Sequence, residues 1–194
     1  MKKTLLIVLL MMISAMLFAG PFGMEFGWTL RELEESGVYA EESMQQGTAT
    51  SYFVVPNNQH PLLFAYVVFI DNEYGLFQIR AISQPYLEEY QIRAVFGDLK
   101  SQLTTAYGEP VMDWDSIPDD SEWQGSENFI SSILYGDRLL TAIWLPEPTE
   151  NGPAMVSLGI LPINESSAFV LLEYSAENTD KIIERYNESN AAIL

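Results

Sequence analysis

Two segments of equal length in this chain align with each other without a gap. The first runs from Pro61 to Ser83 and the second from Pro153 to Ser175, with Asn72-Glu73 falling on Asn164-Glu165. Each segment has an apolar run, a short polar turn and a second β-type run, which predicts an antiparallel hairpin. We therefore expect a duplicated unit, and a chance likeness of two hairpins is the alternative.

Further elements complete each unit. Thr29 and Glu32 form a capping-box pattern that predicts a helix over 28–37, and apolar residues at helical spacing predict another over 86–107. The other expected elements are strands at 48–55, 62–70, 76–83, 139–145, 154–161 and 168–175, and short helices at 128–134 and 179–187.

The order of these elements predicts an α+β fold class. We expect tandem repeats of a helix plus a three-stranded antiparallel meander, forming one curved sheet with helices on one side. The repeats make up a single domain over 20–194, with repeat one at about 22–85, repeat two at about 86–176 and a C-terminal helix at about 178–188.

The N-terminal residues have the pattern of a secretory signal peptide over 1–19. Lys2 and Lys3 precede an apolar run at 5–13, and Leu17-Phe18-Ala19 is the expected cleavage tripeptide. An uncleaved N-terminal anchor is the alternative. No cysteine follows the apolar run, so we expect no lipid anchor and a periplasmic or secreted protein.

The charge of the chain limits its partners. It has 9 basic and 27 acidic residues and a net charge of −18. Removal of Lys2 and Lys3 would give 7 − 27 = −20. Such a field disfavours nucleic acid and anionic lipid surfaces as partners and suits solubility, cation binding or a basic partner protein. The expected partner is a protein or an apolar ligand. With no cysteine, the chain depends on its apolar core and not on disulfides for stability.

The segment Phe22-Gly23-Met24-Glu25-Phe26-Gly27-Trp28-Thr29, together with the repeated helix-and-meander order, supports a resemblance. The chain resembles the β-lactamase-inhibitor-protein-like group of exported bacterial proteins, which includes the SmpA/OmlA-type outer-membrane assembly lipoproteins. It differs from them in having neither a lipid-attachment cysteine nor a bracing cysteine pair. The resemblance implies a binding module and not an enzyme.

The run over 62–70 is apolar at almost every position, so one face of the sheet is either core or a binding surface. We expect Tyr66, Trp144 and Tyr174 to line such a surface with their polar tips outward. Arg80 is a candidate to hold a ligand or partner carboxylate, and an ion pair with Glu173 is the alternative.

Catalytic motifs are missing from the sequence, and His60 lies in a predicted loop. We therefore expect a non-catalytic protein, with a carboxylate-based hydrolase or a calcium-binding adhesion or structural protein as alternatives. Candidate calcium ligands are Asp113, Asp115, Asp119 and Asp120, together with Glu122. A solvated acidic loop packed by Trp114 and Trp123 is the alternative for this segment.

Overall fold

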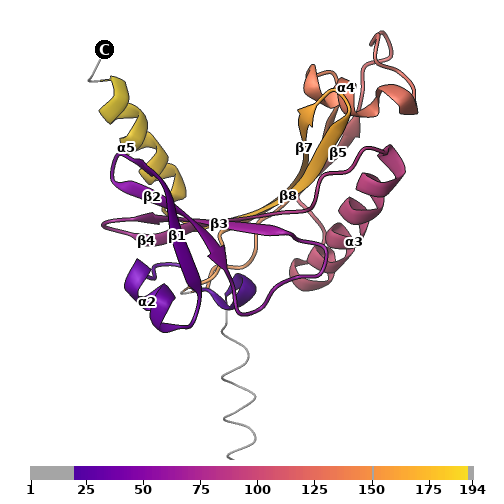
Figure 1. Ribbon diagram of the computed structural model, residues 1–194. Helices are drawn as coiled ribbons and strands as arrows, with labels where there is room; N and C mark the ends of the chain where they lie inside the picture. Colours follow the sequence, from indigo (N-terminus) through magenta and orange to yellow (C-terminus); the bar gives the residue numbers. More distant parts are fainter. Residues whose placement is uncertain (1–19, 150, 192–194) are drawn as a thin grey trace, which may run out of the picture.

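The computed structural model describes residues 20–149 and 151–191, so the predicted signal peptide lies outside the described residues. The strands form one open eight-stranded antiparallel sheet in the order β1-β2-β3-β4-β8-β7-β6-β5 (Figure 1). They are β1 (Tyr39–Gln46), β2 (Ala49–Val55), β3 (Ala65–Asp71), β4 (Gly75–Ile82), β5 (Met112–Ser116), β6 (Leu139–Trp144), β7 (Met155–Asn164) and β8 (Ser167–Ser175). The α-helices are α2 (Leu30–Glu35), α3 (Glu89–Tyr107), α4 (Phe129–Leu134) and α5 (Thr179–Ala191), with 3₁₀ turns η1 (Pro21–Gly23) and η2 (Ser126–Asn128).

The predicted mixture of helices with one antiparallel sheet is confirmed. Both predicted hairpins form, as β3–β4 and β7–β8, and their second strands pair with each other at the centre of the sheet. Two edge strands, β1 and β5, were not predicted, so each half of the sheet has four strands instead of three. Strand β1 is rich in acidic and amide side chains, and β5 has only five residues, two of them acidic, features that are also typical of a polar loop.

The first helix begins at the predicted capping box. The backbone N–H of Thr29 donates to Glu32 Oε2 at 2.8 Å, and the backbone N–H of Glu32 donates to Thr29 Oγ1 at 3.3 Å. These bonds satisfy two donors that a helix N-terminus otherwise leaves unpaired. The hydrogen bonds that the Thr29 N–H and the Thr29 hydroxyl donate to the Glu32 carboxyl hold its pKa below the ordinary value.

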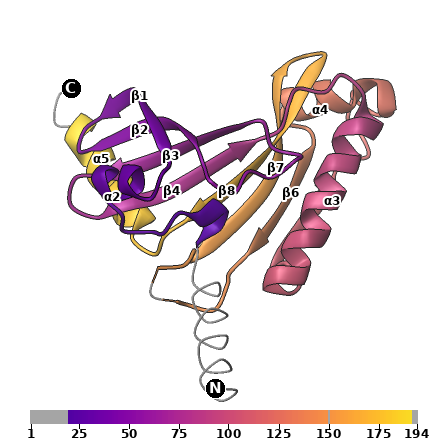
Figure 2. The same cartoon turned by 60° about the horizontal axis from the view of Figure 1, so that its bottom comes forward.

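One face of the sheet is covered by α3 and by the N-terminal segment, and we call it the covered face. Helix α3 packs against β7 and β8, and the η1 side chain Phe22 contacts the rings of Tyr66 and Tyr174. Figure 2 shows α3 at one end of the sheet and α2 at the other. The core between these layers includes Val68, Ile79, Leu99, Leu158 and Leu172, all nearly inaccessible to solvent.

Helix α5 packs on the opposite face, so the expectation that all helices lie on one side is wrong. Figure 1 shows α5 and α2 on opposite sides of the β1–β4 half of the sheet. A bulge in β4 shapes the surface on which α5 packs. Phe69 pairs with Gln78 and Ile70 pairs with Leu76, which leaves Phe77 as an extra residue in β4. Phe77 and Gln78 therefore both face α5.

A close backbone crossing fixes the N-terminal segment against the start of β4. The Gly27 N–H donates to the Leu76 carbonyl at 2.8 Å, and the Leu76 N–H donates to the Trp28 carbonyl at 2.7 Å. Gly75 has φ +69°, and a Cβ atom there would lie 2.1 Å from the Gly27 carbonyl oxygen. Glycine is required at this position for both reasons.

Candidate functional site

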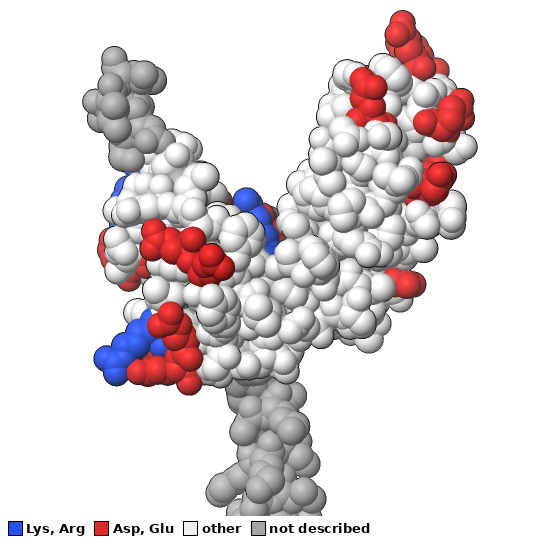
Figure 3. All heavy atoms as spheres, in the orientation of Figure 1, with Lys and Arg blue, Asp and Glu red and all other residues white. Residues whose placement is uncertain are grey.

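The face of the sheet opposite α3 is left uncovered beyond α5, and we call it the open face. Figure 3 shows this side of the molecule as a hollow with mostly uncharged walls. The strand register places alternate residues of each strand here, such as Phe53 opposite Val67 and Trp114 opposite Thr141. Several of its apolar side chains are exposed to solvent: Tyr39, Met44, Phe53, Val55, Trp114, Leu139 and Leu161.

Acidic groups on the open face are few and mostly paired. The register places Glu41, Asp71 and Glu173 there, and the last two form ion pairs with Arg185 and Arg80. The remaining acidic residues of the strands face the covered side: Glu42, Asp113 and Asp115. In a chain of net charge −18, the open face is thus a surface of low charge.

Arg80 lies near the centre of the open face. Its Nε donates to Glu173 Oε2 at 2.6 Å, so the ion pair considered from the sequence is present. The Arg80 side chain is 43% exposed and that of Glu173 is 15% exposed. The guanidinium carbon lies 4.8 Å from the centroid of the Phe69 ring, a cation–π contact that holds it flat against the sheet.

Tyr66, Trp144 and Tyr174 do not lie on this face. All three are buried on the covered face, where Trp144 Nε1 donates to the Gly108 carbonyl at 3.0 Å and the Tyr66 hydroxyl accepts the His60 N–H at 2.7 Å. Burial raises the pKa values of the Tyr66 and Tyr174 hydroxyls. Their polar tips bind backbone or neighbouring groups inside the protein, which corrects the expectation that they point outward.

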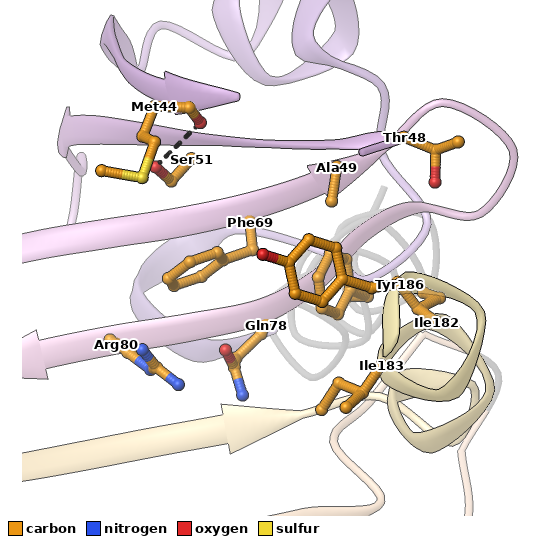
Figure 4. Close-up of a pocket in the computed structure, with 11 residues that line it drawn as sticks. Met44, Thr48, Ala49, Ser51, Phe69, Gln78, Arg80, Ile182, Ile183 and Tyr186 are labelled. Carbon is orange, nitrogen blue, oxygen red and sulfur yellow. Dashed lines mark hydrogen bonds between the residues drawn. The ribbon is translucent and has the colours of Figure 1, made fainter. Parts of the chain in front are cut away.

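A pocket lies between α5 and the open face, with a volume of about 160 Å³ (Figure 4). Its walls come from β1–β4 on one side and from Ile182, Ile183 and Tyr186 of α5 on the other. Phe69 and Phe77 form an apolar wall, with ring centroids 6.2 Å apart. Arg80 and Gln78 bring polar groups to the same pocket, as Figure 4 shows. A largely apolar pocket with a few convergent polar groups is the usual form of a small-molecule site.

Two polar anchors hold α5 over this pocket. Thr179 Oγ1 donates to the Phe77 carbonyl at 3.0 Å. Arg185 donates to Asp71 Oδ2 at 2.6 Å and to Glu73 Oε2 at 2.7 Å. Burial opposes ionisation of Asp71, but hydrogen bonds from Thr48, from the Glu73 N–H and from Arg185 together lower its pKa below the ordinary value.

Two of the predicted calcium ligands, Asp113 and Asp115, form ion pairs with side chains of α3. Lys100 Nζ lies 2.5 Å from Asp113 Oδ2, and Arg93 Nη1 lies 2.6 Å from Asp115 Oδ2, so α3 neutralises both carboxylates of β5. Asp119 and Asp120 follow in an exposed turn. Within 20–149 and 151–191, no three His, Asp or Glu side chains form a group able to hold a metal ion.

His60 is part of the structure of its loop. Its Nδ1 accepts the Leu62 N–H at 3.2 Å, and its Nε2 lies 3.0 Å from Gln102 Oε1. An accepting Nδ1 places the proton on Nε2, which then donates to the glutamine. The ring is therefore occupied by structural hydrogen bonds at both nitrogens.

The sequence indicated no binding role for Phe53, Trp114, Gln78 or the α5 residues. Phe53 and Val55 alternate with Val54 in β2, a pattern that marks two faces without telling which is covered.

Comparison with protein-family models, with curated proteins and with solved structures finds no match. In the part of the chain that is described, no helix is long and apolar enough to cross a membrane.

Proposed function

We propose that this chain is an exported, non-catalytic binding protein that uses its open face to contact a partner protein or an apolar ligand. The observation that carries the proposal is the exposed apolar surface in the hollow, including Phe53 and Trp114, which are 52% and 51% exposed. Exposed apolar side chains gathered on one face of a soluble protein usually mark an interaction surface. The low charge of this face allows it to be desolvated at little cost.

The shape of the sheet also supports a binding role. The open face is concave between α5 and the β5–β7 end of the sheet (Figures 1 and 3). Concave surfaces enclose more of a bound molecule than flat ones, and aromatic anchors near their centre contribute most of the binding energy.

We further infer that the fold arose by duplication. The strand order reads β1-β2-β3-β4 from one edge and β5-β6-β7-β8 from the other, and a helix precedes each set. This arrangement supports two equivalent halves and is compatible with the resemblance to the β-lactamase-inhibitor-protein-like and SmpA/OmlA-like group. The duplicated unit is then a helix followed by four strands, one strand more than the sequence predicted.

A capture experiment tests the binding role. The protein without residues 1–19, immobilised as bait, should retain a partner from the envelope fraction of its own cells. Phe53→Asp and Trp114→Asp each place a charge on the open face and should lower this capture at least about tenfold, because a charge buried without a partner at an interface costs more than 1.4 kcal/mol.

Tyr90→Asp is the matched control, since Tyr90 is 71% exposed and lies on α3, away from the open face. Capture that is equally strong with all three variants contradicts the proposal. Circular dichroism and thermal unfolding establish that the variants remain folded, as expected for substitutions at exposed positions.

A further inference from the structure

We propose that the pocket beneath α5 binds a small carboxylate that carries an apolar tail, with the carboxylate held by Arg80 and Gln78. The inference rests on the proposed binding function and names a ligand class for one part of the open face. The pocket joins a donor pair to an apolar wall within a single cavity of about 160 Å³. Straight-chain fatty acids are the simplest molecules of this class.

The Arg80 guanidinium has a vacant edge. Arg93 binds Glu89 through Nε and Asp115 through its Nη atoms, and Arg185 likewise contacts two carboxylates. Arg80 binds Glu173 through Nε, and within the described residues its Nη atoms donate no hydrogen bond to a carboxylate. An arginine offers five N–H donors in a planar fork, so the Nη edge of Arg80 has room for a second carboxylate.

Gln78 is 6% exposed and lines the pocket beside Arg80. Its side-chain amide has no hydrogen-bond partner within the described part of the chain, and its nitrogen and oxygen are not sealed from solvent. Buried amides in native proteins are nearly always hydrogen-bonded. An amide that opens into a cavity beside a vacant guanidinium edge therefore indicates a polar ligand group at that point.

The rest of the pocket is small and mostly apolar. Phe69, Phe77, Ile182 and Ile183 supply apolar walls. A cavity of roughly 150 Å³ accommodates a benzene-sized group, so this one takes a short alkyl segment or a ring.

The charge of the ligand follows from Glu173. Its carboxylate already neutralises Arg80, and a second anion nearby is repelled by Glu173 and by the negative field of the chain. A single negative charge with two direct hydrogen bonds can overcome this repulsion, whereas a doubly charged phosphate doubles it. The site is therefore suited to a monoanion with a large apolar part.

Isothermal titration calorimetry with octanoate, 1-octanol and octylamine tests the proposal on the folded protein. Octanoate should bind at least about tenfold more tightly than 1-octanol, because charge-assisted hydrogen bonds are the difference between them. Octylamine should bind more weakly than either, since it places a cation against Arg80. Equal affinities for octanoate and 1-octanol in the unmodified protein, or no binding of octanoate, overturn the proposal.

Three variants locate the site. Arg80→Gln should abolish the preference for octanoate over 1-octanol, and Gln78→Leu should reduce it. Because Arg80→Gln leaves Glu173 without its ion pair, the double variant Arg80→Gln with Glu173→Gln is made alongside it and should show the same loss. Arg31→Gln is the matched control, as Arg31 pairs with Glu35 on the exposed surface of α2. A preference for octanoate that survives the double variant contradicts the assignment.

The two proposals fail separately. Phe53 and Trp114 do not line the pocket, so Phe53→Asp and Trp114→Asp should leave octanoate binding unchanged. Loss of partner capture in these variants without any octanoate binding supports the open face and rejects the carboxylate site. Octanoate binding, together with partner capture that no variant lowers, supports the carboxylate site and rejects the open face as the partner surface.

Discussion

Arg185 on α5 donates from Nη2 to Oδ2 of Asp71 at the end of β3, over a distance of 2.6 Å. The Asp71 side chain is completely buried, and it also accepts a hydrogen bond from Thr48 and from the Glu73 and Tyr74 N–H groups. This carboxylate therefore joins the β1–β2 turn, the β3–β4 turn and the C-terminal helix. Together with the Thr179 anchor, this connection holds α5 over the pocket on the open face.

We expect Asp71→Asn to destabilise the protein by about 2 kcal/mol at neutral pH, because a buried group loses charge-assisted hydrogen bonds. The folded-state pKa of Asp71 lies below its unfolded value, so between these two pKa values the unfolded chain binds more protons. The contribution of Asp71 is thus complete above pH of about 4 and is lost as the pH falls through the lower folded pKa. Urea unfolding at a series of pH values measures this.

Glu73→Gln is the control for that experiment. Glu73 contacts the same Arg185, but its side chain is 63% exposed, and exposed ion pairs contribute little to stability. A destabilisation by Asp71→Asn that is the same at pH 7 and at pH 2, or one matched by Glu73→Gln, contradicts this role of Asp71.

Gly75→Ala should destabilise the fold by roughly 3 kcal/mol, from the positive φ and from the contact with the Gly27 carbonyl. Gly136→Ala provides the comparison, because Gly136 has φ +82° with no atom within 4 Å of the added Cβ. It should cost about 1 kcal/mol from the backbone alone. Chemical denaturation of both variants measures the difference, and equal losses mean that the crossing of Gly27 over β4 is not as described.

The hairpins were predictable because each combines two β-type runs with a polar turn. The edge strand β5 was not predictable, because Asp113 and Asp115 are typical of a solvent-exposed loop. In the structure their carboxylates pair with Lys100 and Arg93 of α3. The charge partners of these aspartates come from a different part of the chain, and local patterns contain no information about them.

The candidate site was predicted less well than the fold, for a similar reason. The run over 62–70 is apolar on both sides, so the sequence does not tell which side α3 covers, and Tyr66 was assigned to the wrong one. Gln78 and Phe77 share a face only because of the bulge in β4. A helix after the last strand was predicted, but its position over the pocket depends on Arg185 reaching Asp71. Arg80 was singled out because basic residues are rare in this chain, and the structure places it on the open face in an ion pair with Glu173.

We expect added calcium to leave the melting temperature unchanged. Asp113 and Asp115 already have cationic partners, so a calcium ion would have to displace Lys100 and Arg93 to bind them. Differential scanning fluorimetry in millimolar calcium and in chelator measures this directly. A rise in melting temperature that disappears in Asp113→Asn and Asp115→Asn would falsify this expectation and restore the calcium-binding alternative.

Export is tested by the N-terminus of the protein recovered from cells. If residues 1–19 form a cleaved signal peptide, mass spectrometry of the secreted or periplasmic protein should find Gly20 as its first residue. Ala19→Arg should block cleavage, because signal peptidases accept small residues at this position, and the uncleaved protein should remain with the membrane fraction. Gln45→Arg is the control, since Gln45 is exposed and the substitution adds the same charge beyond the cleavage site, which should leave processing intact. An unmodified chain recovered from membranes with residues 1–19 still attached supports the anchor alternative. The open face would then work at a membrane surface and not on a released protein.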